Sequence, residues 1–263
     1  MRINGSMHTM VRTAVISLSA LALWSCKAKP VVAEKLGYEL ISSTTHDSGA
    51  YTQGLQIVSG RLWESTGQYG SSSVRELNPE TGEVLRKRSL PAEVFGEGLT
   101  LFGKEMWVLT WKEKTAYVLD PESFRTLRTH TYEGEGWGLT SDGTHLIMSD
   151  GSATLTFRDP KDLSVIRKLE VKDNGRPLKL LNELEYIKGS IFANVYTTDR
   201  VARIDPESGE VTGWLDFSAL RSQLPTPNRA EVLNGIAYDE ASGNLRITGK
   251  YWPRMFQVRV KGE

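Results

Sequence analysis

A three-residue pattern returns five times along this chain, and it constrains the fold more than any other feature. Each copy has a variable residue, then glycine in all copies but one, then Leu or Ile. The copies are Gln53-Gly54-Leu55, Glu97-Gly98-Leu99, Trp137-Gly138-Leu139, Asn182-Glu183-Leu184 and Asn234-Gly235-Ile236. They begin at residues 53, 97, 137, 182 and 234, so that 44, 40, 45 and 52 residues separate successive copies. A period of about 40 to 50 residues is typical of propeller blades or of solenoid repeats.

Short apolar runs between the copies decide between these two architectures. In the second unit, residues 106–109 and 116–119 are apolar, the turn residues Asp120-Pro121 follow, and a weaker run covers residues 126–132. Pro after Asp presets the backbone of a turn, and the Asp side chain accepts hydrogen bonds from the residues beyond it. Each unit therefore supplies four short strands and lacks a long amphipathic helix. The sequence predicts an all-β fold, a five-bladed β-propeller with four-stranded blades.

Closing the ring requires a strand from the other end of the chain. The fifth unit ends at residues 255–260, one strand short of a blade, while residues 38–41 precede the first unit and belong to no blade. Pairing these two segments would tie the chain ends together and remove an exposed sheet edge. We therefore expect an N-terminal strand to close the last blade of a propeller domain that covers residues 36–263.

The repeated pattern presents one variable side chain per unit to a common place, the channel that the innermost strands of a propeller surround. This first column contains Gln53, Glu97, Trp137, Asn182 and Asn234. A second column follows 14 residues later in four units, and 16 residues later in the fifth, where the turn is longer; it contains Gly67, Trp111, Gly151, Tyr196 and Lys250. We expect both columns at one mouth of the channel, as a site of amides, aromatic rings, one carboxylate and one lysine.

The composition and the remaining motifs exclude several other classes of function. The chain has 32 basic and 32 acidic residues, and 30 against 32 once residues 1–26 take away Arg2 and Arg12, whereas nucleic-acid binding requires a basic surplus. Its four histidines are scattered and it has one cysteine, so we expect no metal site of His and Cys. The sequence shows neither a nucleophile elbow nor a glycine-rich phosphate loop. We expect a monomer with no nucleic-acid partner.

Residues 1–26 have the features of a lipoprotein signal peptide. Arg12 precedes the apolar run of residues 14–23, which is too short to span a bilayer and fits a secretory signal. The run ends in Leu23-Trp24-Ser25-Cys26, which resembles a bacterial lipobox in which Cys26 receives the lipid. An ordinary signal peptide with a chance cysteine is the alternative. Because Lys27 rather than Asp follows, we expect an exported, periplasmic protein anchored to the outer membrane, with residues 27–35 as a linker.

Glu97 is the one carboxylate in the two columns and the candidate for proton transfer. Nearby aromatic side chains at 95, 111 and 137 would exclude water, and removal from water raises the pKa of a carboxyl toward neutrality, where it can both accept and release a proton. The alternative is a structural channel carboxylate whose charge is satisfied by backbone amides. Glu64 is a second acid, at a strand-interior position, and we expect it to be buried for structural reasons.

Seven segments of the chain occur in the order and form of one known family. They are Tyr51-Thr52-Gln53-Gly54-Leu55, Glu64-Ser65-Thr66-Gly67, Phe95-Gly96-Glu97-Gly98-Leu99, Gly136-Trp137-Gly138-Leu139, Asn182-Glu183-Leu184-Glu185, Ala193-Asn194-Val195-Tyr196 and Leu233-Asn234-Gly235-Ile236. From about residue 38 to residue 260 the chain resembles the plant and bacterial type of glutaminyl cyclase. The resemblance implies a five-bladed propeller, in agreement with the repeat. It also implies a transferase that converts N-terminal glutaminyl residues of peptides or proteins to pyroglutamate with release of ammonia.

The same resemblance implies roles for individual residues. Glu97 corresponds to the family's proton-transferring glutamate, and the family's polar contacts correspond to Gln53, Asn182 and Lys250. The family's aromatic pocket corresponds to Tyr51, Phe95, Trp111, Trp137 and Tyr196. The family often has Phe at the first of these positions and Trp at the last, so substrate affinity is expected to differ. Some members hold a cation in the channel; here we expect no required cofactor, no dedicated metal ligands, and a purely structural role for any such ion.

Two other functions remain open on the sequence. A metal-dependent propeller lactonase or other hydrolase would hold a calcium ion with carboxylate and amide oxygens, and Glu97, Asn182 and Asn234 offer such oxygens. A non-catalytic, lipid-anchored binding propeller would need no proton carrier, and a glutamate placed beside tryptophans argues against it.

Overall fold

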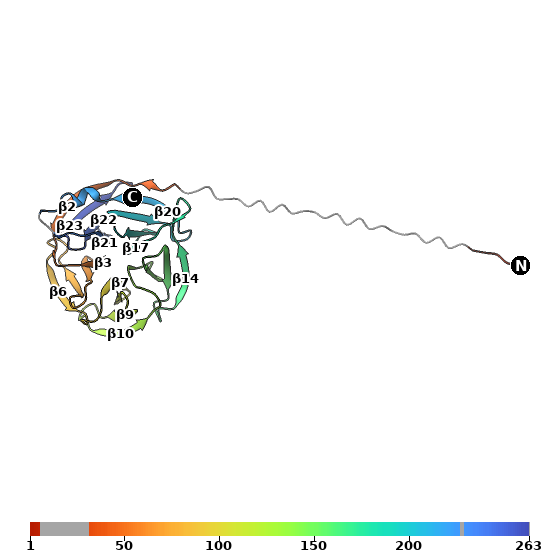
Figure 1. Ribbon diagram of the computed structural model, residues 1–263, viewed down its shortest axis with the longest axis horizontal. Coiled ribbons are helices and arrows are strands. Elements are labelled where there is room, and N and C mark those ends of the chain that lie inside the picture. The colour runs from red at the N-terminus through yellow and green to blue at the C-terminus, as the bar shows by residue number, and fades with distance from the viewer. Residues whose placement is uncertain (6–31, 227–228, 263) are drawn as a thin grey trace.

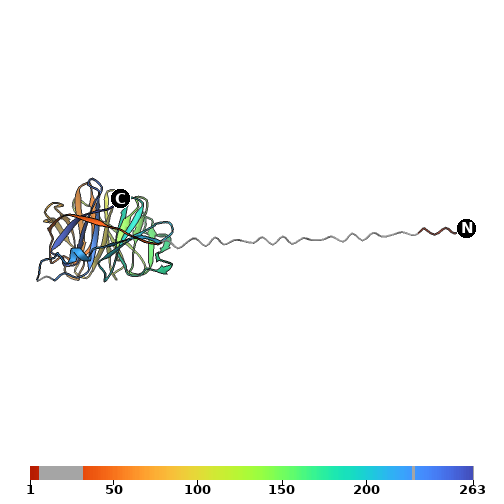
Figure 2. The same ribbon diagram turned by 90° about the horizontal axis from the view of Figure 1, so that it is seen from above.

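The protein forms a disc of five antiparallel sheets arranged around a central channel (Figure 1). The structure, a computed structural model, describes residues 1–5, 32–226 and 229–262. Seen from the side, most strands run between the two faces of the disc (Figure 2). The predicted five-bladed β-propeller is confirmed. Residues 6–26 of the predicted signal peptide, Cys26 among them, lie outside the described residues.

In the first four blades the strands follow one another in sequence from the channel outward. The first blade contains β3 (Thr52–Val58), β4 (Arg61–Thr66), β5 (Ser73–Leu77) and β6 (Val84–Ser89). The second contains β7 (Gly96–Phe102), β8 (Glu105–Thr110), β9 (Thr115–Leu119) and β10 (Thr126–Thr131). The third contains β11 (Leu139–Ser141), β12 (Leu146–Met148), β13 (Thr154–Arg158) and β14 (Val165–Glu170). The fourth contains β17 (Leu181–Ile187), β18 (Ser190–Val195), β19 (Arg200–Ile204) and β20 (Val211–Asp216).

The last blade combines both ends of the described domain, as predicted. Its strands are β21 (Leu233–Asp239), β22 (Asn244–Gly249), β23 (Arg254–Val260) and, outermost, β2 (Tyr38–Thr45). The antiparallel register of β2 and β23 runs from Tyr38 opposite Val260 to Thr45 opposite Arg254, so the closing strand is longer than residues 38–41. This pairing covers the edge that an incomplete fifth blade would expose.

Three short elements complete the structure. The strand β1 (Glu34–Lys35) lies in the stretch that the sequence places in the linker, and it pairs in parallel with β20 at the outer edge of the fourth blade. A two-stranded hairpin joins β15 (Lys172–Asp173) to β16 (Arg176–Pro177), and the short helix α1 (Ser218–Arg221) follows the fourth blade. In the part of the chain that the structure describes, no helix is long and apolar enough to cross a membrane.

The hydrophobic core lies between the blades rather than within any one of them. Five clusters of buried side chains each combine residues from two neighbouring sheets. Trp63 of the first blade, for example, packs in one cluster with Val108 of the second. Each sheet buries its faces only by packing against the neighbouring sheets. Each blade therefore depends on the adjacent blades for its stability.

Glu64 is fully buried and holds the closing strand against the first blade, so its contacts are structural. Its Oε1 accepts hydrogen bonds from His46 Nε2 at 2.9 Å and from Thr52 Oγ1 at 2.7 Å. His46, just beyond β2, also donates through Nδ1 to the carbonyl of Trp252 at 2.7 Å. Burial alone would lower the pKa of His46, but the adjacent carboxylate of Glu64 raises it overall. The two side chains therefore form a buried ion pair at the junction of the ring.

The repeated pattern coincides with a break in the pairing of the innermost strands. The register between the first and second strands of a blade shifts at residues 52–54, 96–99, 181–184 and 233–236. Such a bulge leaves a residue without a partner in the ladder and redirects its side chain. In these four blades the bulge therefore turns the first-column residue toward the channel, whereas Trp137 of the third blade lies just before β11. At the glycine that follows, the blades come so close that a Cβ at Gly138 would lie 2.0 Å from the carbonyl oxygen of Asn182.

Candidate active site

A cavity of about 220 Å³ opens at the mouth of the channel where the innermost strands begin. All nine side chains that the sequence assigns to the site line this cavity: Tyr51, Gln53, Phe95, Glu97, Trp111, Trp137, Asn182, Tyr196 and Lys250. The structure thus brings together residues that span almost 200 positions of the chain. Their individual roles remain predictions, which the contacts of each side chain make specific.

Aromatic rings line the cavity in two groups. In one group Phe95 lies between Tyr51 and Trp111, with ring centroids 5.9 and 5.6 Å away. In the other, Trp137 and Tyr196 meet edge to face at 5.6 Å. The second-column glycines make room for these rings, because a Cβ at Gly151 would lie 2.6 Å from the Trp137 indole. The rings exclude water from the polar groups between them.

Glu97 lies in the cavity with a single side-chain partner. Its side chain is buried, and its Oε1 accepts a hydrogen bond from Gln53 Nε2 at 2.8 Å. Among the described residues nothing donates to its Oε2. Burial raises the pKa of Glu97 well above its usual value; the charge of Lys250 opposes this shift, and the carboxylates of Glu135 and Glu113 add to it. The result is an acid that retains its proton well above the pH at which an exposed glutamate loses it.

Glu183 is a structural carboxyl of the channel, and its contacts differ from those of Glu97. Glu183 occupies the middle position of the fourth copy, where the other copies have glycine. Its Oε1 accepts from the amide of Leu55 at 3.2 Å, and its Oε2 accepts from the amide of Ile236 at 2.9 Å. These two amides lie on the channel-facing edges of the first and fifth blades. At such an edge an amide has no neighbouring strand to bond to, so it needs another acceptor. The contrast leaves Glu97 as the carboxyl that is open to a ligand.

Lys250 is a buried cation in the same cavity. Its Nζ lies 4.5 Å from the ring centroid of Tyr51 and 5.1 Å from that of Tyr196. Burial lowers the pKa of Lys250 to about 8, while the carboxylates of Glu97 and Glu231 oppose that shift. At neutral pH the ammonium group therefore remains largely charged and is held against aromatic faces, which stabilise a cation.

Three further residues at the cavity do not lie in the predicted columns. Glu135 accepts hydrogen bonds at one oxygen, Oε2, from the indole nitrogens of both Trp111 and Trp137, at 2.7 and 3.0 Å. Gln68 lines the cavity, and Tyr251 packs on Tyr51 with ring centroids 5.1 Å apart. Gln68 and Tyr251 each follow a second-column residue directly and have positive φ angles of 98° and 59°. Their position next to that column is the sequence signal that would have found them.

Two buried amide oxygens near the cavity have no hydrogen-bond partner among the described residues: Oδ1 of Asn182 and Oδ1 of Asn234. A buried polar atom without a partner is costly, so it marks a place where a ligand or an ordered water molecule binds. Within the same described ranges, no three His, Cys, Asp or Glu side chains gather as a set that could hold a metal ion.

The fold and the cavity together define a propeller protein with a buried carboxyl set among aromatic rings at one mouth of its channel. The chain matches the family model described as glutamine cyclotransferase over residues 14–260. It is 40% identical over 227 residues to the glutaminyl-peptide cyclotransferase of Arabidopsis thaliana, covering 85% of this chain and 71% of that protein. The crystal structure of the glutaminyl cyclase of Myxococcus xanthus superposes with a TM-score of 0.82 at 36% identity, over 87% of this chain and 98% of that one. The chain therefore belongs to the glutamine cyclotransferase family.

Proposed function

We propose that this protein cyclises N-terminal glutaminyl residues of peptides or proteins to pyroglutamate and releases ammonia, with Glu97 as the general acid and base. The family supports the reaction. The observation that supports the role of Glu97 is its geometry: a buried carboxyl with one oxygen held by Gln53 and the other open to an aromatic cavity. Such a group moves a proton between two nitrogens of one bound ligand.

The reaction forms one carbon–nitrogen bond and breaks another. The neutral α-amine attacks the carbon of the side-chain carboxamide, and ammonia leaves from that carbon. Glu97 gives its proton to the departing nitrogen and takes one from the attacking nitrogen, so the enzyme ends unchanged. Because nucleophile and electrophile belong to one residue, positioning provides much of the rate. Proton transfer by a positioned carboxyl adds roughly 10² to 10⁴.

The other polar groups of the cavity stabilise the substrate as charge develops. In this proposal the Lys250 ammonium offsets the negative charge that forms on the carboxamide oxygen; loss of one such donor typically costs about 2.7–4 kcal/mol. The unpartnered Oδ1 of Asn182 is an acceptor for an N–H of the substrate. The aromatic walls hold the side-chain stem and exclude water, which would otherwise hydrolyse the carboxamide.

The proposal is tested by measuring ammonia release from a Gln-Xaa dipeptide with wild-type protein and with Glu97→Gln. The variant keeps the shape of the side chain and its hydrogen bond from Gln53 but cannot carry a proton, so it should fold and lose at least about 10² of the rate. Glu185→Gln, a buried glutamate at the other mouth of the channel, is the matched control and should keep full activity. Unchanged turnover in Glu97→Gln would exclude Glu97 as the proton carrier.

We propose further that the reaction needs no metal ion, since proton transfer and positioning account for the chemistry. The same assay in the presence of a chelator distinguishes this from a metal-dependent hydrolase: activity should persist, whereas a loss that added metal restores would refute it.

The export and lipid anchor also belong to the proposal. Their support is the sequence alone, with the apolar run of residues 14–23 followed by Cys26. A periplasmic enzyme held at the outer membrane would act on N-terminal glutamine in exported peptides or proteins.

A further inference from the structure

A chain of buried amides ends at Glu97. Asn234, which is fully buried in β21, donates from Nδ2 to the carbonyl oxygen of Thr52 at 2.9 Å and to Oε1 of Gln53 at 3.2 Å. Gln53, which is 3% exposed, donates in turn from Nε2 to Oε1 of Glu97 at 2.8 Å. The hydrogen bonds therefore lead from a backbone carbonyl of the first blade, through the fifth blade, to the carboxyl in the second.

The orientation of every amide in this chain follows from its first member. A backbone carbonyl oxygen can only accept, so the atom of Asn234 that faces Thr52 must be the NH₂ nitrogen. The second hydrogen of that nitrogen needs an acceptor, so the atom of Gln53 that faces it must be Oε1. Gln53 then presents its own NH₂ group to Glu97. A rotation of either amide by 180° would place two oxygens or two NH₂ groups against each other.

The fixed orientation of Gln53 makes the two oxygens of Glu97 inequivalent. In a neutral carboxyl group one oxygen is a carbonyl acceptor and the other carries the proton. Gln53 donates to Oε1, so Oε1 is stabilised as the carbonyl oxygen and the proton resides on Oε2, to which no described residue donates. We propose that Asn234 is a positioning residue for the cyclisation, an inference that rests on the proposed function. Asn234 acts through Gln53 to keep the transferable proton of Glu97 on the oxygen that faces the substrate.

Removal of Asn234 frees Gln53 to turn. With Oε1 of Gln53 turned toward Glu97, the carboxyl group would donate its proton to Gln53 and would offer the substrate an oxygen without a proton. Loss of a buried hydrogen bond is large enough to change the orientation of Gln53, because the low local dielectric strengthens such a bond. Asn234 itself does not line the cavity, so its effect should appear in the proton-transfer step and not in substrate affinity.

The decisive experiment is a double-mutant cycle on Asn234 and Gln53, measured by steady-state ammonia release. Asn234→Ala should lower kcat about tenfold, the equivalent of about one hydrogen bond, and change KM by less than about threefold. If Asn234→Ala does not fold, Asn234→Asp takes its place. This variant keeps the shape of the side chain but loses its donors when ionised, and the same loss of kcat is expected. The variant with both Asn234→Ala and Gln53→Ala should be no slower than Gln53→Ala alone.

Asn244→Ala is the matched control, because Asn244 is a buried asparagine of the same blade that accepts from Arg259 Nε at 3.2 Å, away from the site. It should keep the wild-type kcat. If the losses from Asn234→Ala and Gln53→Ala multiply, Asn234 does not act through Gln53 and the inference is wrong. It is equally wrong if Asn234→Ala keeps kcat within about twofold of wild type, which is less than one hydrogen bond.

A second readout does not depend on activity. The infrared carbonyl stretch of protonated Glu97, assigned by its loss in Glu97→Gln, reports which hydrogen bonds the carboxyl makes. Asn234→Ala and Gln53→Ala should shift this band in the same way, and Asn244→Ala should leave it in place. If wild-type protein releases no ammonia, the proposed function fails, but the band still decides the inference: an unshifted band in Asn234→Ala overturns it.

Discussion

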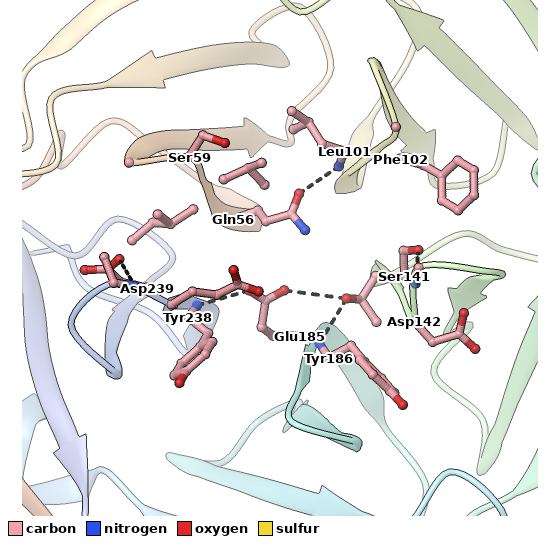
Figure 3. Close-up of a pocket in the computed structure, with 18 residues that line it drawn as sticks. Gln56, Ser59, Leu101, Phe102, Ser141, Asp142, Glu185, Tyr186, Tyr238 and Asp239 are labelled. Carbon is pink, nitrogen blue, oxygen red and sulfur yellow. Dashed lines mark hydrogen bonds between the residues drawn. The ribbon is translucent and has the colours of Figure 1, made fainter.

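Glu185 allows a strict test of the electrostatics of this channel, far from the proposed chemistry. It lies in a cavity of about 850 Å³ at the mouth opposite the aromatic one, where the innermost strands end (Figure 3). Its side chain is buried, and its carboxyl accepts from the amide of Tyr238 at 3.0 Å and from the hydroxyl of Thr140 at 3.5 Å. Burial raises the pKa of Glu185 from 4.5 to about 8, against the lowering effect of these hydrogen bonds.

The sign and size of the effect on stability follow from this pKa. Below pH 4.5 both the folded and the unfolded chain hold the proton of Glu185, so the group contributes nothing. Between pH 4.5 and about 8 the unfolded chain releases the proton while the folded chain retains it, and stability falls by about 1.36 kcal/mol per pH unit. At pH 7, 2.5 units above the usual value, the cost is about 3 kcal/mol.

Glu185→Gln removes this titration, because a glutamine has the shape and hydrogen-bonding groups of the neutral acid. Its stability advantage over wild type should therefore grow by about 3 kcal/mol between pH 4.5 and pH 7. The measurement is urea unfolding followed by tryptophan fluorescence at several pH values, with the free energy of unfolding from linear extrapolation. An advantage that does not change with pH, or that shrinks as pH rises, would refute the reasoning.

Glu76→Gln is the contrasting control for that measurement. Hydrogen bonds from Arg61 lower the pKa of Glu76, with further lowering from Arg86 and opposition from burial. The carboxylate therefore stabilises the fold above its unfolded pKa and loses that contribution as pH falls. Wild type should exceed Glu76→Gln in stability at pH 7, and this excess should shrink toward pH 4, the reverse of the trend for Glu185→Gln.

Two further predictions concern substrate binding and the anchor. Glu135→Ala frees both indoles of the cavity walls and should raise KM about tenfold in the ammonia-release assay, with a smaller change in kcat, since hydrogen bonds to a charged group are worth about 1.5–3 kcal/mol. Glu133→Ala, which removes a neighbouring carboxylate whose side chain is 97% exposed, should leave KM unchanged; equal effects in the two variants would contradict the role of Glu135. Cys26→Ser should move the protein from the membrane fraction to the soluble fraction and abolish labelling by fatty acid, and a wild-type protein that is already soluble would contradict the anchor.

The sequence predicts the ring and most of the side chains that line its mouth because both depend on periodic spacing. Tyr51, which lies outside the two columns, is implied only by the family resemblance. A repeat of similar length implies equivalent blades, and a fixed offset within each blade implies a common height in the channel. For that reason Trp111 and Tyr196, although far apart in the chain, are placed together with Glu97 by spacing alone.

What the sequence did not predict depends on more than that spacing. The bulges depend on a single extra residue in a strand, which a two-residue alternation does not reveal. Glu135 acts from a loop two residues before Trp137, and its importance depends on the side-chain directions of two tryptophans. In the sequence, Glu183 only marks the copy in which glycine is absent. In the structure it connects three blades across the channel, because the amides of Leu55 and Ile236 face it.

The bridge made by Glu183 also determines how a substrate can travel. From the fourth blade the side chain accepts hydrogen bonds from the first and fifth blades, and the cavities at the two mouths of the channel share no lining residue, so the aromatic cavity is a separate, one-ended pocket. A polypeptide cannot thread such a dead end; it can insert only its tip. A glutamine at the start of a chain reaches the bottom of the aromatic cavity, whereas a glutamine in the middle of a chain does not. The ammonia leaves through the same opening by which the peptide entered.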